Sequence, residues 1–140
     1  MEISYSTSCR DIDWNLVAEI LETVGMSHHR PDIHRQAFEA SHTTIFAHCR
    51  GRLIGFGRAI SDGQYQAALY DCAVLPEFQG QGVGSAIIGR IVERLSHCNI
   101  ILYASPGKEQ FYQNHGFARM KTGMALFLQM QSKREHGFIE

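Results

Sequence analysis

A glycine-rich stretch, Gln79–Ser85, constrains the fold of this chain more than any other feature. It reads Gln-Gly-Gln-Gly-Val-Gly-Ser and separates a strand-like segment from a helix-like one. Glycines at such a junction let successive backbone N–H groups turn towards one point without obstruction by Cβ atoms. The helix that follows adds its unpaired N–H groups and the positive end of its dipole. The stretch therefore predicts a cradle for a phosphate group.

The two common nucleotide loops fit this stretch poorly. A dinucleotide fingerprint needs Gly-x-Gly-x-x-Gly, and here Gly80 and Gly82 fit but the third position is Ser85. A Walker loop ends in Gly-Lys-Ser/Thr, whereas Gly84 is followed by Ser85-Ala86. A tight strand–helix connection without a ligand is the alternative. Three glycines in five residues are more than such a connection needs.

The segments before the loop predict two helices and three strands. Apolar residues between Leu16 and Val24 recur with helical spacing, Asp13 is a candidate N-cap, and Gly25 ends the pattern. Pro31 suits the first turn of a second helix. The inner face of that helix is expected to carry Ile33, Ala37 and Phe38. The predicted strands, Thr43–Cys49, Leu53–Ile60 and Tyr65–Val74, form an antiparallel meander, with Asp62-Gly63 as a hairpin turn.

The segments after the loop predict a parallel crossover. Ile87 to Leu95 repeats the helical spacing, and the apolar run Ile100–Ala104 reads as a short strand covered on both faces. A last helix is expected over Pro106–His115, and two short closing strands over Phe117–Met120 and Met124–Gln129. The predicted fold class is α+β: a meander, a β-α-β crossover and helices on both faces of a mixed sheet. We expect one domain over residues 1–130, and a polar tail over 131–140 that frays.

Composition narrows the class of partner. With 140 residues, 44% of them apolar, and a net charge of −1, the chain has neither the bias of a disordered segment nor the basic excess of a nucleic-acid binder. No apolar run approaches the ~20 residues of a membrane helix, and the start of the chain lacks the pattern of a signal peptide. The four cysteines are widely spaced and suggest neither a disulfide scaffold nor a zinc site. We therefore expect a cytoplasmic protein that needs no metal, no nucleic acid and no membrane.

Three motifs in the same order resemble one family. Gln79-x-x-Gly82-x-Gly84 resembles the pyrophosphate loop of the GNAT superfamily of N-acetyltransferases. Tyr70–Phe78 resembles the strand and turn that precede this loop, and Phe111–Phe117 resembles the family's last helix and the strand after it. The resemblance covers about residues 2–130. The segment Leu53–Gly63 is similar to a bacterial and plastid subgroup that includes serotonin and arylalkylamine acetyltransferases.

The resemblance implies a GNAT fold, with acetyl-CoA as cosubstrate and direct transfer to an amine. The strand Asp71–Val74 should splay from Ile100–Ala104, helped by a bulge, and expose backbone groups for pantetheine. The N–H of Val74 should hold the thioester oxygen. The implied cofactor-binding residues are Cys72, Ala73, Val74, Gln79, Gly80, Gln81, Gly82, Val83, Gly84, Ser85, Ser105, Phe111 and Tyr112.

The candidate catalytic groups are a base and an acid. An alkylamine is mostly protonated at neutral pH, so a carboxylate, or water leading to one, must take a proton. Asp71 is the first candidate and Glu77 the second; a partner role for Asp71 towards a nearby Arg is equally consistent with the sequence. Tyr112 resembles the family's general acid, and Ser105 stands where some relatives have Asn or Asp.

Substrate contacts are expected from the loop after the first helix and from the second strand. The candidates are His28, His29, Arg30, Arg58 and Asp62, bordered by Met26 and Ser61. Arg58 and Asp62 could instead serve as a salt bridge or as turn residues. The acceptor could be a small primary amine, or a protein N-terminus or lysine. A module that binds acetyl-CoA without turnover, and a homodimer that completes the closing sheet, also remain open.

Overall fold

The computed structural model describes residues 2–140, which form two compact units. The first ends at Leu102 and the second spans Tyr103–Glu140. The first unit contains the whole sheet, the three longest helices and the glycine-rich loop. The second contains two short helices and the connecting segments around them.

The first unit is built on a five-stranded mixed sheet in the order β1-β2-β3-β4-β5. Three of its strands form the predicted antiparallel meander, and β4 pairs with β5 in parallel, as the crossover prediction requires. β1 pairs with β2 at the other edge and was not predicted, because four residues carry too little pattern. The strands are β1 (Ile3–Ser6), β2 (Thr43–Cys49), β3 (Arg52–Ser61), β4 (Gln66–Val74) and β5 (Asn99–Ile101).

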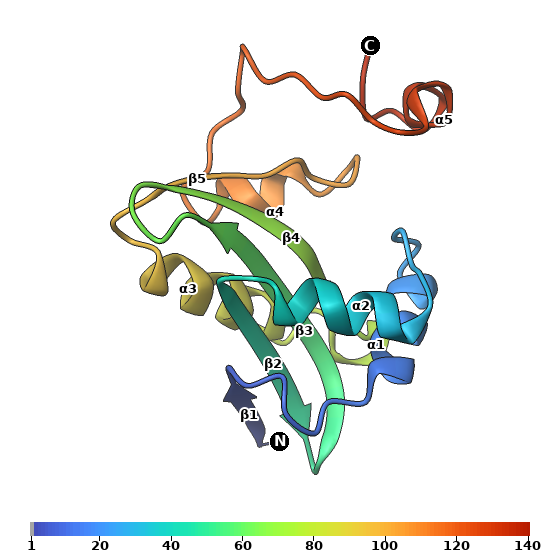
Figure 1. Ribbon diagram of the computed structural model, residues 1–140, viewed down its shortest axis with the longest axis vertical. Helices are drawn as coiled ribbons and strands as arrows, with labels where there is room; N and C mark the ends of the chain where they lie inside the picture. The colour runs from blue at the N-terminus through green and yellow to red at the C-terminus, as the bar shows by residue number, and fades with distance from the viewer. Residues whose placement is uncertain (1) are drawn as a thin grey trace. The chain divides into compact units, whose positions relative to one another are not determined.

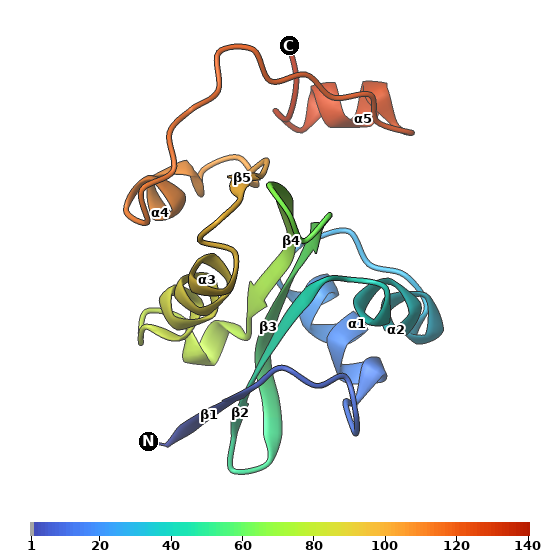
Figure 2. The same ribbon diagram turned by 60° about the vertical axis from the view of Figure 1, so that its left-hand side comes forward.

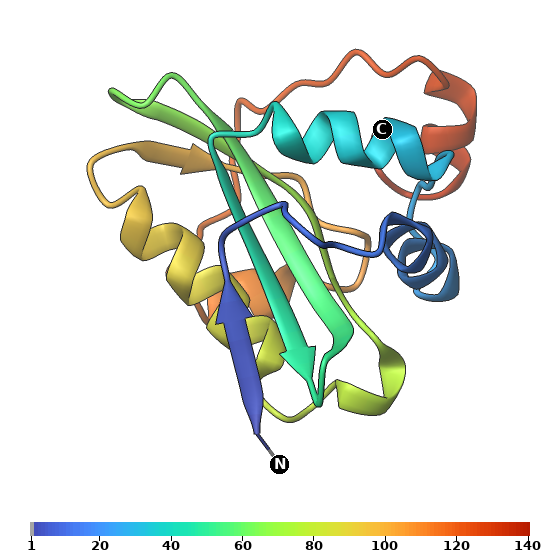
Figure 3. The ribbon, with the colours of Figure 1, turned by 60° about the horizontal axis from the view of Figure 1, so that its bottom comes forward.

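Helices cover both faces of this sheet, which confirms the predicted layers. The helices α1 (Trp14–Thr23) and α2 (Pro31–Glu39) lie on one face, and α3 (Val83–Arg94) lies on the other (Figures 1 and 2). Asp13 is the predicted N-cap of α1, because its Oδ1 accepts the Leu16 N–H at 3.2 Å. Figure 3 shows the strands lengthwise, with α3 on their left and with α1 and α2 towards the right.

An aromatic cluster forms the core between α2 and the sheet. The Phe38 ring of α2 lies 5.7 Å from the rings of both Phe46 and Phe56, and Trp14 of α1 packs 5.5 Å from Phe38. Phe38 is fully buried, as predicted. The rest of the predicted inner face is partly wrong, because Ile33 is exposed and His34 is buried instead. One helical turn separates His34 from Phe38, so the two side chains share a face.

On the opposite face, α3 packs close to the strands because β3 carries two glycines. Ile87, Ile88 and Ile91 of α3 are all buried against the sheet. A Cβ at Gly57 would lie 2.8 Å from Cys72 Sγ and 3.0 Å from Ile87 Cγ2. A Cβ at Gly55 would lie 3.0 Å from the Ala73 carbonyl oxygen. Larger residues at these two positions would therefore push α3 and β4 away from β3.

The second unit departs most from the sequence predictions. Its helices are α4 (Glu109–Gln113), shorter than predicted, and α5 (Met130–Glu135), which lies partly in the tail predicted to fray. The predicted closing strands at 117–120 and 124–129 are wrong: among residues 2–140 these segments pair with no strand. Apolar alternation makes a strand only where a neighbouring strand completes its hydrogen bonds. Three side chains of the second segment are almost fully exposed: Met124, Leu126 and Leu128.

Two further differences concern the strand after α3. It runs over Asn99–Ile101 rather than 100–104. Ile101 is 50% exposed, so the prediction of a strand covered on both faces is wrong. The short length of β5 matters for the site, because the β4–β5 pairing ends at Ala68.

Candidate active site

The glycine-rich loop forms the predicted junction between β4 and α3. A 3-10 turn, Pro76–Phe78, follows β4, and α3 begins at Val83. Gly80 and Gly82 adopt φ values of +77° and +85°, and a Cβ at either would meet no atom within 4 Å. Among the described residues, no side-chain hydrogen bond caps the N-terminus of α3. Within residues 2–140, no hydrogen bond uses the N–H groups of residues 80–84, so they are available to an external acceptor.

Two glutamine side chains fix the shape of this loop. Gln79 Nε2 donates to the Val74 carbonyl at 2.9 Å, and Gln81 Nε2 donates to the Glu77 carbonyl at 3.2 Å. Both bonds tie the loop back to the end of β4 and the 3-10 turn. The side-chain amides of these two predicted cofactor-binding residues are therefore engaged within the protein. What the loop offers to a ligand is its backbone.

The predicted splay between β4 and β5 is confirmed. Their parallel register runs only from Gln66 opposite Asn99 to Ala68 opposite Ile101. The Leu75 N–H donates to the Ile54 carbonyl on the β3 side at 2.8 Å. Neighbouring N–H groups of an extended strand point to opposite sides, so the Val74 N–H points away from β3. It therefore faces the side of β4 that β5 leaves open.

The predicted bulge is also present, and it lies at Asp71. The β3–β4 register passes from Phe56 opposite Ala73 to Arg58 opposite Tyr70. Asp71 and Cys72 thus stand opposite the single residue Gly57. Asp71 has φ +54°, a left-handed conformation that non-glycine residues adopt at a cost.

The Asp71 carboxylate forms an ion pair with Arg58. Arg58 Nε donates to Asp71 Oδ2 at 2.7 Å, and the two side chains are only 15% and 23% exposed. The partner role that the sequence left open for Asp71 is thus occupied, and Arg58 is its partner. The other candidate base, Glu77, lies 3.7 Å from Arg52 in a pair whose side chains are both more than half exposed.

Cys72 lies beside Asp71 but faces α3. Burial, reinforced by the charge of Asp71, raises the pKa of its thiol to about 12. A thiol with that pKa is protonated at neutral pH, and the thiolate is the nucleophilic form. Cys72 is therefore unsuited to carry an acyl group, although its backbone remains the predicted contact for pantetheine.

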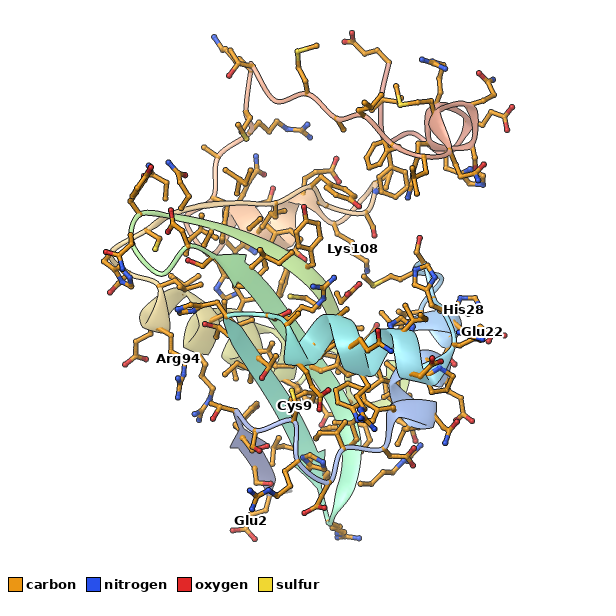
Figure 4. The ribbon with its side chains drawn as sticks, viewed as in Figure 1. Glu2, Cys9, Glu22, His28, Arg94 and Lys108 are labelled. Atoms are coloured by element: carbon orange, nitrogen blue, oxygen red, sulfur yellow. The ribbon has the colours of Figure 1, made fainter. Side chains whose placement is uncertain are left out.

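The predicted substrate loop, residues 26–30, is held to α1 and α2. His28 Nε2 lies 3.6 Å from Glu22 (Figure 4), and Arg30 lies 3.4 Å from Asp32. The His29 N–H donates to His34 Nε2 at 2.8 Å. Sequence reasoning missed His34, although its place one turn before Phe38 marked it as an inward position.

Asp62 lies at the β3–β4 hairpin and acts as a turn residue. Its Oδ1 accepts the N–H groups of Gln64, Tyr65 and Gln66 at 2.8–3.1 Å. These bonds lower the pKa of the carboxyl group. Ser61 Oγ donates to the Gln66 carbonyl in the same turn. The turn reading of Asp62 thus has a direct structural basis, and its substrate role stays a prediction.

The remaining predicted residues belong to the second unit. Tyr112 is on α4, with its ring 5.1 Å from Phe111 and 6.0 Å from Phe117. Ser105 precedes α4, and its carbonyl accepts the Lys108 N–H at 2.9 Å. The acid role of Tyr112 and the cofactor contacts of Ser105 and Phe111 stay predictions.

Neither a metal centre nor a membrane span was found in the part of the chain that the structure describes. No group of three His, Cys, Asp or Glu side chains in residues 2–140 could hold a metal ion. No helix within the same residues is long and apolar enough to cross a bilayer.

Three proteins that are named as N-acetyltransferases are similar to part of this sequence. A rice protein, serotonin N-acetyltransferase 2, chloroplastic, is 33% identical over 118 residues, which cover 79% of this chain and 59% of the relative. An Arabidopsis thaliana protein, GCN5-related N-acetyltransferase 2, chloroplastic, is 44% identical over 76 residues, covering 52% and 30%. An uncharacterized N-acetyltransferase, ycf52, from Pyropia yezoensis is 34% identical over 76 residues, covering 52% and 44%. The chain thus spans less than two thirds of the length of these relatives.

Solved structures share the fold. A probable acetyltransferase from methicillin-resistant Staphylococcus aureus, SA2161, superposes with a TM-score of 0.79 at 23% identity, covering 90% of this chain and 99% of that one. A Xanthomonas campestris protein described as a putative acetyltransferase of the GNAT family gives 0.81 at 23% identity, covering 91% and 94%.

The family itself is established by a domain match. Residues 13–125 match the acetyltransferase (GNAT) domain, and this range includes the loop, the bulged strand and α4. Loop, splay and bulge are the features that the resemblance predicted. The chain belongs to the GNAT family of acetyltransferases.

Proposed function

We propose that this chain is an acetyl-CoA-dependent N-acetyltransferase that acetylates a primary amine of a small molecule by direct attack in a ternary complex. One observation carries the proposal: the unused N–H groups of residues 80–84 lie at the start of α3, directly after the strand that β5 leaves open. Together these features offer a diphosphate cradle and, next to it, a strand edge for an amide-rich arm.

The residues fit coenzyme A in both shape and chemistry. Gly80 and Gly82 leave open space where a Cβ would stand, so a diphosphate can approach the backbone closely. Cys72 and Val74 offer backbone groups at the open edge of β4, where pantetheine can pair as an added strand. The bound cosubstrate supplies an activated acetyl thioester.

The chain's own groups then do three things. The Val74 N–H donates to the oxygen on which negative charge develops. Asp71 takes a proton from the acceptor ammonium, which frees the nitrogen lone pair for attack. Tyr112, in the role that the family resemblance assigns to it, donates a proton to the departing sulfur.

Direct transfer is favoured over a covalent enzyme intermediate by the state of Cys72. Its pKa of about 12 leaves almost no thiolate at neutral pH, so the thiol nearest to the bulge is a poor acyl carrier. The name of the rice relative, serotonin N-acetyltransferase, supports an arylalkylamine as the first acceptor to test. Its chloroplast label and that of the Arabidopsis relative leave our cytoplasmic prediction unsupported.

A thiol-release assay with acetyl-CoA tests this function. The acceptors should include arylalkylamines, polyamines and peptides with free N-termini or lysines. We expect release of free coenzyme A with an arylalkylamine and little with peptides. Turnover confined to peptides would transfer the chain to the protein acetyltransferases. Binding of acetyl-CoA by calorimetry without turnover on any acceptor would indicate a sensor, and absence of binding would refute the proposal.

A further inference from the structure

Asp71 combines a strained backbone with a partly buried charge. Of residues 2–140, only Asp11, Arg50 and Asp71 have positive φ without being glycine, and only Asp71 lies within a strand. Strain of this kind persists where surrounding contacts over-determine it. The 2.7 Å bond from Arg58 is the contact that reaches this side chain.

Arg58 is itself fixed from several sides. Its Nη1 donates to Ser41 Oγ at 3.2 Å, and Ser41 Oγ donates in turn to the Ala37 carbonyl at 2.8 Å. Its guanidinium carbon lies 5.6 Å from the Phe38 ring centroid and 5.5 Å from that of Tyr70. Two rings and two hydrogen bonds leave the guanidinium little freedom. An arginine held in this way can hold a carboxylate in one orientation.

The bond engages one carboxylate oxygen of Asp71 and leaves the other. Arg58 Nε bonds Oδ2, and no hydrogen bond within the described residues uses Oδ1. The Asp71 side chain keeps 23% of its surface exposed, so a small amine can reach it. The Arg58 side chain is engaged with Asp71 and Ser41, and its contact with the substrate stays a prediction.

We propose that Arg58 is a positioning residue for acetyl transfer: it holds Asp71 so that Oδ1 receives the proton of the acceptor amine. The inference rests on the proposed function, because it assumes that Asp71 is the base. Ser41 supports Arg58 by accepting the hydrogen bond from its Nη1. Proton transfer depends steeply on the placement of the base, so loss of this support reduces turnover more than binding.

A double-mutant cycle between Arg58 and Asp71 tests the inference. We expect Asp71→Asn to lower kcat about 100-fold or more and Arg58→Gln to lower it about 10- to 50-fold. If Arg58 acts through Asp71, the double variant should be no slower than Asp71→Asn alone. The KM for acetyl-CoA should stay within about twofold in all three, because the loop that holds it is untouched.

Milder substitutions distinguish a loss of positioning from a loss of folding. Arg58→Lys keeps the charge but not the fork that reaches both Asp71 and Ser41, so it should recover only part of kcat. Ser41→Ala should lower kcat about two- to fivefold while Arg58 stays in place. Arg35→Gln, which breaks an exposed pair with Glu39 on α2, is the matched control and should leave kcat unchanged. Thermal melts of each variant report how much of the protein is folded.

The outcomes separate the inference from the function on which it rests. If the effects of Arg58→Gln and Asp71→Asn multiply, Arg58 does not act through Asp71 and the inference is wrong. If the wild type turns over but Asp71→Asn does not slow it, the base assignment fails and the inference fails with it. If the wild type shows no turnover on any amine, the proposed function itself is refuted.

Discussion

Gly82 and Gly89 form a matched pair that tests the phosphate cradle. A Cβ at either glycine would meet no atom within 4 Å, so neither Gly→Ala change introduces a clash. The two differ in backbone conformation, because Gly82 has φ +85° at the N-terminus of α3, whereas Gly89 lies inside the helix. The two variants therefore test two different backbone effects, and neither effect is complicated by a steric clash.

The expected changes in stability have opposite signs. Alanine in the left-handed region costs about 1–2 kcal/mol, so Gly82→Ala should lower the free energy of unfolding by that amount. Alanine in a helix interior is favoured over glycine by roughly 0.5–1 kcal/mol, so Gly89→Ala should raise it. For a chain of this size 1 kcal/mol shifts Tm by roughly 3–5 °C, and urea unfolding resolves the same difference.

The functional expectation concerns acetyl-CoA alone. The methyl group at Gly82 would project into the open space beside the unused N–H groups, so the KM for acetyl-CoA should rise about tenfold, equivalent to about 1.4 kcal/mol. Gly89→Ala should leave that KM unchanged. Equal KM values for the two variants would contradict the placement of the diphosphate on this loop. Equal stabilities would contradict the conformational argument.

Three further predictions follow from the titrating groups. Burial lowers the pKa of His34 below its usual 6.5, so the folded state binds fewer protons than the unfolded state, and stability should fall as the pH drops below about 6.5. The variant His34→Gln keeps an acceptor for the His29 N–H and should weaken this dependence. Urea unfolding at about pH 7.5 and 5.5 measures it. Because the pKa of Cys72 is raised to about 12, acetyl-CoA without an acceptor should leave the protein unacetylated by intact mass, and an acetyl thioester on Cys72 would overturn direct transfer. Asp62→Ala removes the acceptor of three N–H groups and should lower Tm without changing the KM for the amine, whereas a raised KM would restore Asp62 as a substrate residue.

Local signals in the sequence predicted much of the first unit. Asp13 and Pro31 mark helix starts, and the β-branched run from Thr43 to Cys49 gave a strand with those bounds. These signals succeed because each depends on neighbours in the chain. The closing strands failed because pairing depends on a distant partner that local alternation does not reveal.

The candidate site was predictable as a set of positions but not as a set of pairs. Arg58 and Asp71 were both singled out, and an Arg partner for Asp71 was left open, but the sequence did not identify Arg58 as that partner. Their pairing depends on the bulge, which places two residues of β4 opposite one of β3 and turns Asp71 towards Arg58. The family resemblance implied a bulge in this strand, but it did not indicate which side chain the bulge redirects.

Gly55 and Gly57 of β3, which lie beneath α3, help to determine the position of the phosphate cradle although they are not part of it. The loop starts where the strand ends and stops where the helix begins, so the height of α3 above the strands sets the level of the cradle relative to the neighbouring edge. A bulkier residue at position 55 or 57 would push α3 away from the sheet. Substitutions at these two positions would therefore change the affinity for the coenzyme without contacting it. A mutagenesis screen restricted to residues that line the coenzyme site would overlook them.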